Sequence, residues 1–165
     1  MSTQYRVTSP EREIDEVMAR YVRAHDYRDA AAMSALFADD GVVEIFYCGN
    51  RENEHLGTLE GAATIGNAIA GMMKPHPPRG WSHNVTSSHI VHVDGDTATL
   101  EVQFIIFNAV GDEQPADGWP AGAFGSQGSI TPIESGYYET TLHRSGDQWK
   151  ITKHVIKHDI PYALA

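Results

Sequence analysis

The residue types in this chain that could do chemistry are histidines, carboxylates and tyrosines. The sequence contains nine histidines, and an imidazole titrates near neutral pH, so it can both accept and donate a proton. A carboxylate on one ring nitrogen fixes the tautomer of the imidazole and stabilises its charged form. A tyrosine hydroxyl can donate to a developing oxyanion or to a leaving group. Together these groups suit an elimination next to an acidic C–H bond.

Three such candidates lie close together near the N-terminus. Tyr21 and His25 share the apolar stripe of a predicted helix, where a core tyrosine and a hydrogen-bonded core histidine are the simpler interpretations. Asp26 stands at the helix end, where the dipole disfavours a negative charge, so its position favours a functional role. Five residues rotate a helix by roughly 140°. Tyr21 and Asp26 therefore converge only if a pocket wraps the helix end.

More histidines follow in the second half of the chain. His83 opens a predicted strand, where it is either a catalytic histidine or a hydrogen-bonded histidine at a strand edge. His154 and His158 share one face of the last predicted strand, and we expect one of them to reach a pocket. His89 and His92 would point to opposite faces of a strand. No tight ligand cluster stands out, so the sequence predicts no metal site.

The overall composition narrows the function classes further. We find no Walker loop, GxGxxG, CxxC or HExxH motif, so we predict no cofactor. The net charge of −10 disfavours nucleic acid and anionic membrane surfaces as partners. No apolar run approaches the roughly 20 residues of a membrane span, and the N-terminus lacks a signal core. A single cysteine, Cys48, forms no internal disulfide, which favours the cytoplasm.

The candidate residues must be positioned by helices that come early and strands that come late. Ser9 can cap the first helix and Pro10 suits its first turn. Helices are predicted over 10–27, 29–38 and 61–74, and prolines end the third. Strands are predicted over 42–47, 83–93, 97–107, 134–144 and 148–160, with a polar loop over 49–58.

This order of elements is the α+β pattern. The 165 residues fit a single domain over 1–165. We expect a curved mixed or antiparallel sheet of four to six strands, with three helices on its concave face enclosing a pocket. Strand 97–107 should turn one apolar face inward, formed by Ala98, Leu100, Val102, Phe104 and Ile106. Val85, Val91 and Ile105 suggest a buried outer face, and thus a homo-dimer or homo-trimer.

Residues 108–133 are rich in glycine and proline and are expected to form a long loop insertion. Connections of this length are uncommon inside a domain and are usually functional. Trp119 and Phe124 lie within it, where packing in a core is the weaker explanation. We expect a mobile lid or an inter-subunit arm that closes the pocket, with one of these aromatics touching the ligand.

The layout resembles the SnoaL-like branch of the NTF2-like superfamily, the cystatin-like α+β cone. The resemblance rests on four stretches, Ile14–Asp40, Gly57–Ile69, His83–Ala98 and Gly136–Ile151. Within that superfamily, the scytalone dehydratase and bile acid dehydratase group is the functional template. In the bile acid enzymes a helix tyrosine is followed five residues later by an aspartate, and a histidine opens a central strand. Tyr21, Asp26 and His83 match that pattern, so the resemblance implies that they are catalytic.

The resemblance implies a cofactor-independent lyase that acts on a small hydroxylated aromatic or polycyclic substrate. Dehydration and a related C–C cleavage use the same acid–base groups and stay open. Two alternatives are an isomerase or polyketide cyclase with a carboxylate base, and a non-catalytic small subunit of the ring-hydroxylating dioxygenase type. The long insertion departs from the family pattern. The expected substrate-binding residues are Tyr47, Phe104, Trp119, Phe124, His154 and His25.

Overall fold

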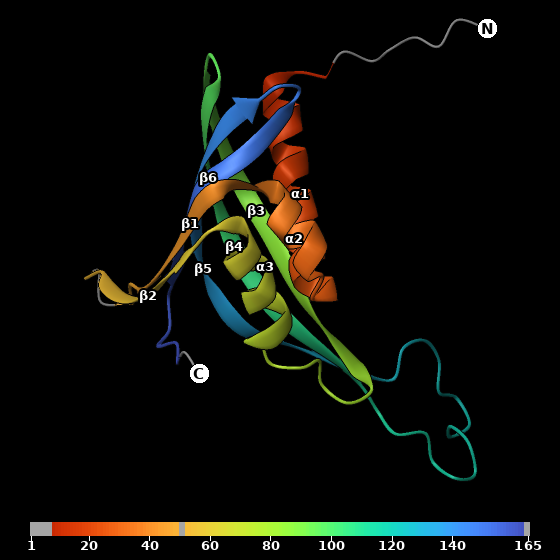
Figure 1. Cartoon of the computed structure of the whole chain (residues 1–165). Helices are drawn as coiled ribbons and strands as arrows, with labels where there is room; N and C mark the ends of the chain where they lie inside the picture. Colours follow the sequence, from red (N-terminus) through yellow and green to blue (C-terminus); the bar gives the residue numbers. More distant parts are fainter. Residues whose placement is uncertain (1–7, 50–51, 164–165) are drawn as a thin grey trace, which may run out of the picture.

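The helices keep to one side of a single, strongly curved sheet (Figure 1). The structure, a computed structural model, describes residues 8–49 and 52–163. None of the helices in these ranges is long and apolar enough to cross a membrane. The elements in chain order are α1 (Pro10–Tyr27), α2 (Ala30–Leu36), β1 (Phe37–Tyr47), β2 (Glu54–Glu60), α3 (Ala62–Gly71), β3 (Gly80–Asp94), β4 (Thr97–Gly111), β5 (Gly128–Ser145) and β6 (Gln148–His158).

The six strands form one mixed sheet in the order β2-β1-β6-β5-β4-β3. β1 and β6 run parallel, whereas the other neighbouring strands are antiparallel. The predicted α+β class and the curved sheet with three helices are confirmed. The loop predicted over 49–58 is wrong in its second half, because β2 pairs with β1. β2 is an edge strand and largely exposed, so it lacks the apolar alternation that identifies a buried strand.

A sharp turn between the first two helices sets the direction of α1. Ser9 caps the start of α1 by accepting from the Arg12 N–H. Arg28 ends α1 in the left-handed conformation, with φ of 55°, and its N–H is bonded to the last carbonyls of the helix. Asp29 then caps α2 by accepting from the Ala32 N–H at 2.9 Å. The C-terminal end of α1 is thereby held against β3.

The core lies between the α1 stripe and the inner faces of the strands. Ile14, Met18 and Tyr21 of α1 are 3% exposed or less. The inner face of β4 is buried as predicted, at Ala98, Leu100, Val102, Phe104 and Ile106. Burying one large apolar side chain contributes about 1.5–3 kcal/mol, so this alternation commits β4 to a single register.

A bulge in β3 changes which residues face outward. The register with β4 shifts between Ser87 and Ile90, and Ser88 has a φ of 55°. Val91 consequently pairs with Leu100 and packs against the core. The expectation that Val91 belongs to the outer face is therefore wrong. Val85 lies before the bulge and is 50% exposed.

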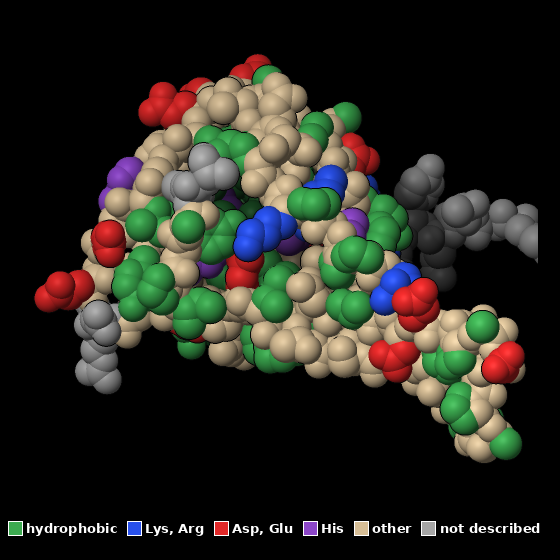
Figure 2. Space-filling model, turned by 90° about the horizontal axis from the view of Figure 1, so that it is seen from below, with side chains coloured by type: hydrophobic (Ala, Val, Ile, Leu, Met, Phe, Trp, Pro, Cys, Tyr) green, Lys and Arg blue, Asp and Glu red, His purple; other side chains and the backbone are tan. Residues whose placement is uncertain are grey.

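The expected loop at 108–133 is shorter than predicted. β4 and β5 continue to pair past their predicted ends, with Asn108 opposite Thr131 and Val110 opposite Ser129. Only residues 112–127 form the connection. The sequence did not predict these strand ends because the two-stranded extension faces no core. Its polar and apolar residues are therefore mixed rather than alternating. Figures 1 and 2 show the connection projecting beyond the body of the molecule.

One buried polar side chain of the core is the imidazole of His154, from β6. Thr140 Oγ1 lies 2.9 Å from its Nδ1, and the rings of Tyr21 and Tyr138 pack beside it. Nε2 is buried and has no hydrogen-bond partner among the described residues. Burial lowers the pKa of His154 to about 3. This imidazole is therefore neutral at physiological pH.

We expect Gly136→Ala to lower the free energy of unfolding by more than about 2 kcal/mol. A Cβ at position 136 would collide with the carbonyl oxygen of Lys157 and approach the Phe104 ring to 2.9 Å. Gly71→Ala is the matched control, since a Cβ there meets no atom within 4 Å, and its effect should stay below about 1 kcal/mol. Urea denaturation measures both. Equal stabilities of the two variants would contradict the predicted close approach of β4, β5 and β6.

The depressed pKa of His154 should make the protein less stable in acid. Below about pH 6.5 the unfolded histidine binds a proton, whereas the folded one resists protonation until about pH 3. Stability is therefore lost as the pH falls between these values. Between about pH 6.5 and pH 4.5 this residue should cost on the order of 2–3 kcal/mol. His154→Gln should flatten the pH dependence by that amount in denaturation curves. Parallel curves for the two proteins would refute the assignment.

Candidate active site

The carboxylate of Asp26 lies where the end of α1 meets β3. Asp26 is in the last turn of α1 and is only 6% exposed. β3 is an edge strand, so N–H groups on its free side need an acceptor outside the sheet. The Asn84 N–H donates to Asp26 Oδ1 at 2.8 Å. The carboxylate thus takes the place of a strand partner and joins α1 to β3.

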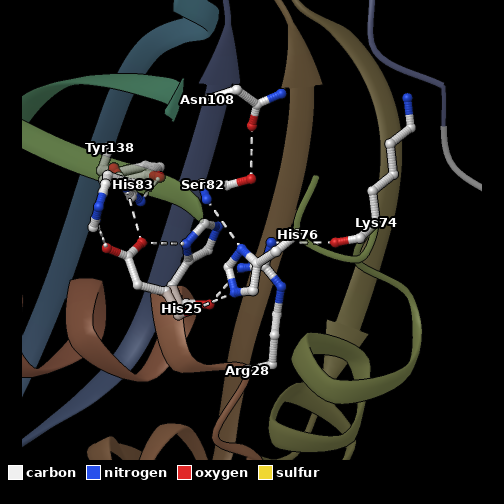
Figure 3. Close-up of polar contacts among 10 residues, drawn as sticks. His25, Arg28, Lys74, His76, Ser82, His83, Asn108 and Tyr138 are labelled. Carbon is white, nitrogen blue, oxygen red and sulfur yellow. Dashed lines mark hydrogen bonds and ion pairs between the residues drawn. The ribbon is translucent and has the colours of Figure 1, made fainter. Parts of the chain in front are cut away.

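Two histidines contact the same carboxylate. Nδ1 of His25 lies 3.2 Å from Asp26 Oδ1, and Nδ1 of His83 lies 3.3 Å from Oδ2; Figure 3 shows both imidazoles at this point. An ionised carboxylate only accepts, so each Nδ1 carries the proton and Nε2 of the neutral ring is free to act as a base. The predicted pair of Asp26 and His83 is therefore within hydrogen-bond distance.

The alternation of β3 places His83 at the rim of the site. Ser82 and Asn84 are buried, whereas His83 and Val85 are exposed on the opposite face of the strand. The side chain of His83 is 53% exposed and that of His25 is 6% exposed. Of the two imidazoles on Asp26, His83 is thus the one that a ligand can reach from outside. Residues 8–49 and 52–163 do not enclose the pair in a closed cavity, since His83 is half-exposed.

The surroundings of Asp26 favour an ionised carboxylate beside a neutral His25. Burial acts to raise the pKa of Asp26, but the hydrogen bonds from His25, Asn84 and His83 together lower it below its ordinary value. Burial also lowers the pKa of His25, against the opposing effect of Asp26. A stable carboxylate on Nδ1 can stabilise the imidazolium that forms when a histidine takes up a proton.

The interior side of the site holds two tyrosines. Asn84 Nδ2 donates to the Tyr138 hydroxyl at 2.8 Å, and the rings of Tyr138 and Tyr21 lie 5.7 Å apart. Burial raises the pKa of both tyrosines, so both stay protonated and able to donate. Among the described residues no hydrogen bond joins Tyr21 directly to Asp26 or His83. Its connection to them runs through Tyr138 and Asn84.

A recess opens at the lower end of the molecule in the view of Figure 1. Figure 2 shows apolar side chains surrounding basic, acidic and histidine side chains on this face. Burial raises the pKa of Glu134, whose Oε2 lies 4.0 Å from His158 Nδ1. The ring of His158 stacks on Tyr162 at 4.1 Å and meets the edge of Phe104. Such an apolar recess with a few polar groups is typical of a small-molecule site.

A second depression lies elsewhere on the surface. A groove of about 870 Å³ runs between α1, α2 and the turn from β5 to β6. Charged side chains such as Glu16, Arg20 and Arg23 line it, and neither Asp26 nor His83 does. Its solvated charges make it the weaker candidate for chemistry, in spite of its size.

The other predicted ligand contacts lie in three different places. Phe104 and His154 are buried beside Tyr138, within reach of the interior side of the site. Tyr47 is half-buried and pairs with His158 across β1 and β6. Trp119 and Phe124 lie on the projecting connection, 40% and 97% exposed. The structure does not bring these last two aromatics to the Asp26–His83 pair.

Sequence reasoning missed several residues of the site. Asn84 and Tyr138 were not singled out, because an asparagine within a strand and one tyrosine among many carry no local signal. His76 also contacts this site, since its Nε2 lies 2.9 Å from the Asp26 carbonyl oxygen. Its position between two prolines indicated only a helix end. Among residues 8–49 and 52–163, no cluster of three or more His, Cys, Asp or Glu side chains is placed to hold a metal ion.

Solved structures with the same fold include proteins of different kinds. An NTF2-like protein with a cystatin-like fold from Novosphingobium aromaticivorans is 23% identical, with a TM-score of 0.63 over 93% of this chain and 84% of that one. A proposed scytalone dehydratase from the same organism is 16% identical, with a TM-score of 0.57 over 94% and 90%.

The beta subunit of a proposed aromatic-ring-hydroxylating dioxygenase from that organism is 15% identical, with a TM-score of 0.65 over 92% and 90%. These likenesses concern the fold alone. No curated protein sequence matches the chain significantly.

A family model for the SnoaL-like domain matches residues 6–155. That match includes α1, with Asp26, and the whole of β3, with His83. The helices, the mixed sheet and the cystatin-like relatives agree with it. The chain therefore belongs to the SnoaL-like domain family, within the NTF2-like, cystatin-like fold.

Proposed function

We propose that this protein is a cofactor-independent acid–base lyase for a small hydroxylated aromatic or polycyclic compound. One observation carries the proposal: buried Asp26, held by the Asn84 N–H, lies 3.3 Å from Nδ1 of the half-exposed His83. A buried carboxylate on the far nitrogen of an accessible imidazole is the arrangement that makes a histidine a competent general base.

The reaction follows from the tautomer that Asp26 imposes. Nε2 of His83 takes a proton from a carbon next to a carbonyl group, and the C–H electron pair forms the new double bond. The C–O bond to the leaving hydroxyl breaks, and the hydroxyl departs as water with the proton returned by the imidazolium. Asp26 stabilises that imidazolium through Nδ1–H. Tyr21 was predicted to donate to the oxyanion or leaving group. Because it is 3% exposed and contacts neither member of the pair, we propose that it acts only indirectly, through Tyr138 and Asn84.

The surroundings support an aromatic substrate. The ring of Trp81 lies 6.3 Å from that of His83 on the rim. An aromatic side chain beside the proposed base favours a flat apolar ligand. The polar atoms of the site can orient a hydroxyl or carbonyl group.

The same geometry disfavours the isomerase alternative. That reaction needs a carboxylate as its principal base, and the three hydrogen bonds to Asp26 lower its pKa. A carboxylate with a lowered pKa is a weak proton acceptor. In the dioxygenase-subunit alternative the Asp26–His83 pair has no role. The experiment below distinguishes that alternative from catalysis.

We also propose that the protein is a homo-oligomer whose partner copy covers the outer face of β3. Val85 is 50% exposed there, and Ile105 pairs with it on the neighbouring strand β4. Tyr137, on the next strand β5, is also 50% exposed. His83 shares this face of β3 with Val85. A copy seated on the patch would also cover His83 and shield the base from water, which strengthens electrostatic interactions in the site.

The aldol of benzaldehyde and acetone is a suitable probe, because dehydration yields benzylideneacetone and C–C cleavage yields benzaldehyde and acetone. We expect turnover by the wild type, a loss of about 100-fold or more in His83→Ala, and at least about tenfold in Asp26→Asn. Product identity, followed by chromatography, separates C–O from C–C cleavage. Tyr21→Phe tests the predicted donor in the same assay.

His89→Ala is the matched control for this series. His89 is also on β3 and also contacts an aspartate of α1, at 3.0 Å from Asp15. It should keep wild-type turnover because it lies outside the site. Full activity in His83→Ala would remove the proposed mechanism. Absence of turnover in the wild type, with tight association to an unrelated large subunit, would favour the non-catalytic alternative.

Val85→Lys should shift the sedimentation coefficient toward that of a monomer, since a lysine cannot be buried unpaired in an apolar interface. Probe turnover should fall at the same time, because His83 loses its cover. Gln148→Lys, at an exposed position at the start of β6, should change neither quantity. A wild type that sediments as a monomer at all concentrations would disprove the oligomer.

A further inference from the structure

We infer that His76 is a positioning residue whose imidazole bridges the two chain segments that carry Asp26 and His83; this inference rests on the proposed function. His76 Nε2 lies 2.9 Å from the carbonyl oxygen of Asp26. Its Nδ1 lies 3.0 Å from the backbone nitrogen of Ser82, the residue before His83. Figure 3 shows His76 between the end of α1 and the start of β3.

The two contacts define the protonation state of His76. A backbone N–H only donates, so Nδ1 must accept from Ser82 and carry no proton. A carbonyl oxygen only accepts, so Nε2 must carry the proton and donate to Asp26. The bridge therefore requires the neutral ring in a single tautomer. No other assignment satisfies both groups.

The surroundings hold the ring of His76 in this orientation. It stacks on the indole of Trp81 with ring centres 4.0 Å apart and planes 17° from parallel. Pro75 and Pro77 flank it and restrict the backbone on both sides. Arg28 fixes the same connection to α1 by donating to the carbonyl of Lys74 at 3.2 Å. The imidazole is thus a rigid spacer between α1 and β3.

The bridge through His76 is needed because the hydrogen bond between Asp26 and His83 is long. The Asp26–His83 distance of 3.3 Å is at the long end for a hydrogen bond, and β3 is an edge strand with sheet pairing on one side only. At the end of α1 that carries Asp26, the Asn84–Asp26 bond and the bridge through His76 are polar contacts that set the two backbones relative to each other. A shift of a few tenths of an ångström would break the contact between carboxylate and imidazole.

Three variants test the bridge. His76→Phe keeps a ring for Trp81 and loses both hydrogen bonds. His76→Asn places an oxygen near the position of Nδ1, so it can still accept from Ser82. His89→Phe is the control, because His89 also ties α1 to β3, through Asp15 and Thr86, but away from the site.

We expect His76→Phe to lower kcat on the aldol probe by about tenfold or more with little change in KM, and His76→Asn to recover part of that loss. Hydrogen exchange at the Ser82 amide should become faster in His76→Phe and return toward the wild-type rate in His76→Asn. His89→Phe should lower the Tm about as much as His76→Phe does, while leaving kcat and hydrogen exchange at Ser82 unchanged. If His76→Phe does not fold, His76→Gln, which lacks an acceptor at the Nδ1 position, takes its place.

Two results would overturn the inference. One is an unchanged kcat in His76→Phe while His83→Ala is inactive, and the other is an equal loss of kcat in His89→Phe. Full activity in His83→Ala would instead overturn the proposed function itself. Exchange at Ser82 reports on the bridge without any substrate, so the two failures are distinguishable.

Discussion

A buried carboxylate needs hydrogen-bond donors, and an edge strand has N–H groups that need acceptors. In this protein one hydrogen bond meets both needs, because the backbone N–H of Asn84 donates to the carboxylate of Asp26. The bond is 2.8 Å long and joins the end of the first helix to the free side of β3. Removing the carboxylate would leave a buried amide without a partner, which costs about 1–3 kcal/mol. The remaining contacts of the site are built around this junction, with two imidazoles on the carboxylate itself.

The histidines differ in their chemistry because they are buried to different extents. His25, His154 and His158 are nearly inaccessible, and burial lowers the pKa of each. These rings are neutral groups in the core, and those of His25 and His154 each make a hydrogen bond through Nδ1. His83 touches the same carboxylate as His25 but lies half in solvent. The four histidines thus differ in their surroundings, because the fold buries three of the rings and leaves His83 on the exposed face of β3.

The fold alone does not decide between catalysis and a structural role. Solved structures with this fold include a proposed dehydratase and the beta subunit of a proposed dioxygenase, so function must be argued from the site. In this chain the contacts of Asp26 with His83 and Asn84, rather than the architecture, support a catalytic role. The projecting connection between β4 and β5 leaves the pair uncovered, which is why we propose that a second copy of the chain covers it.

The sequence by itself determined the class of fold, the three helices and the inner face of β4. These follow from local rules: caps, prolines and periodicity. The pairing of Asp26 with His83 did not follow from local rules and was implied only by the resemblance to the bile acid dehydratase pattern. Tertiary structure alone decided that β2 exists, that a bulge turns Val91 inward, and that β4 and β5 extend to Gly111 and Gly128. It also placed His76 and Asn84 at Asp26, because hydrogen bonds between residues about 50 positions apart leave no local pattern in a sequence.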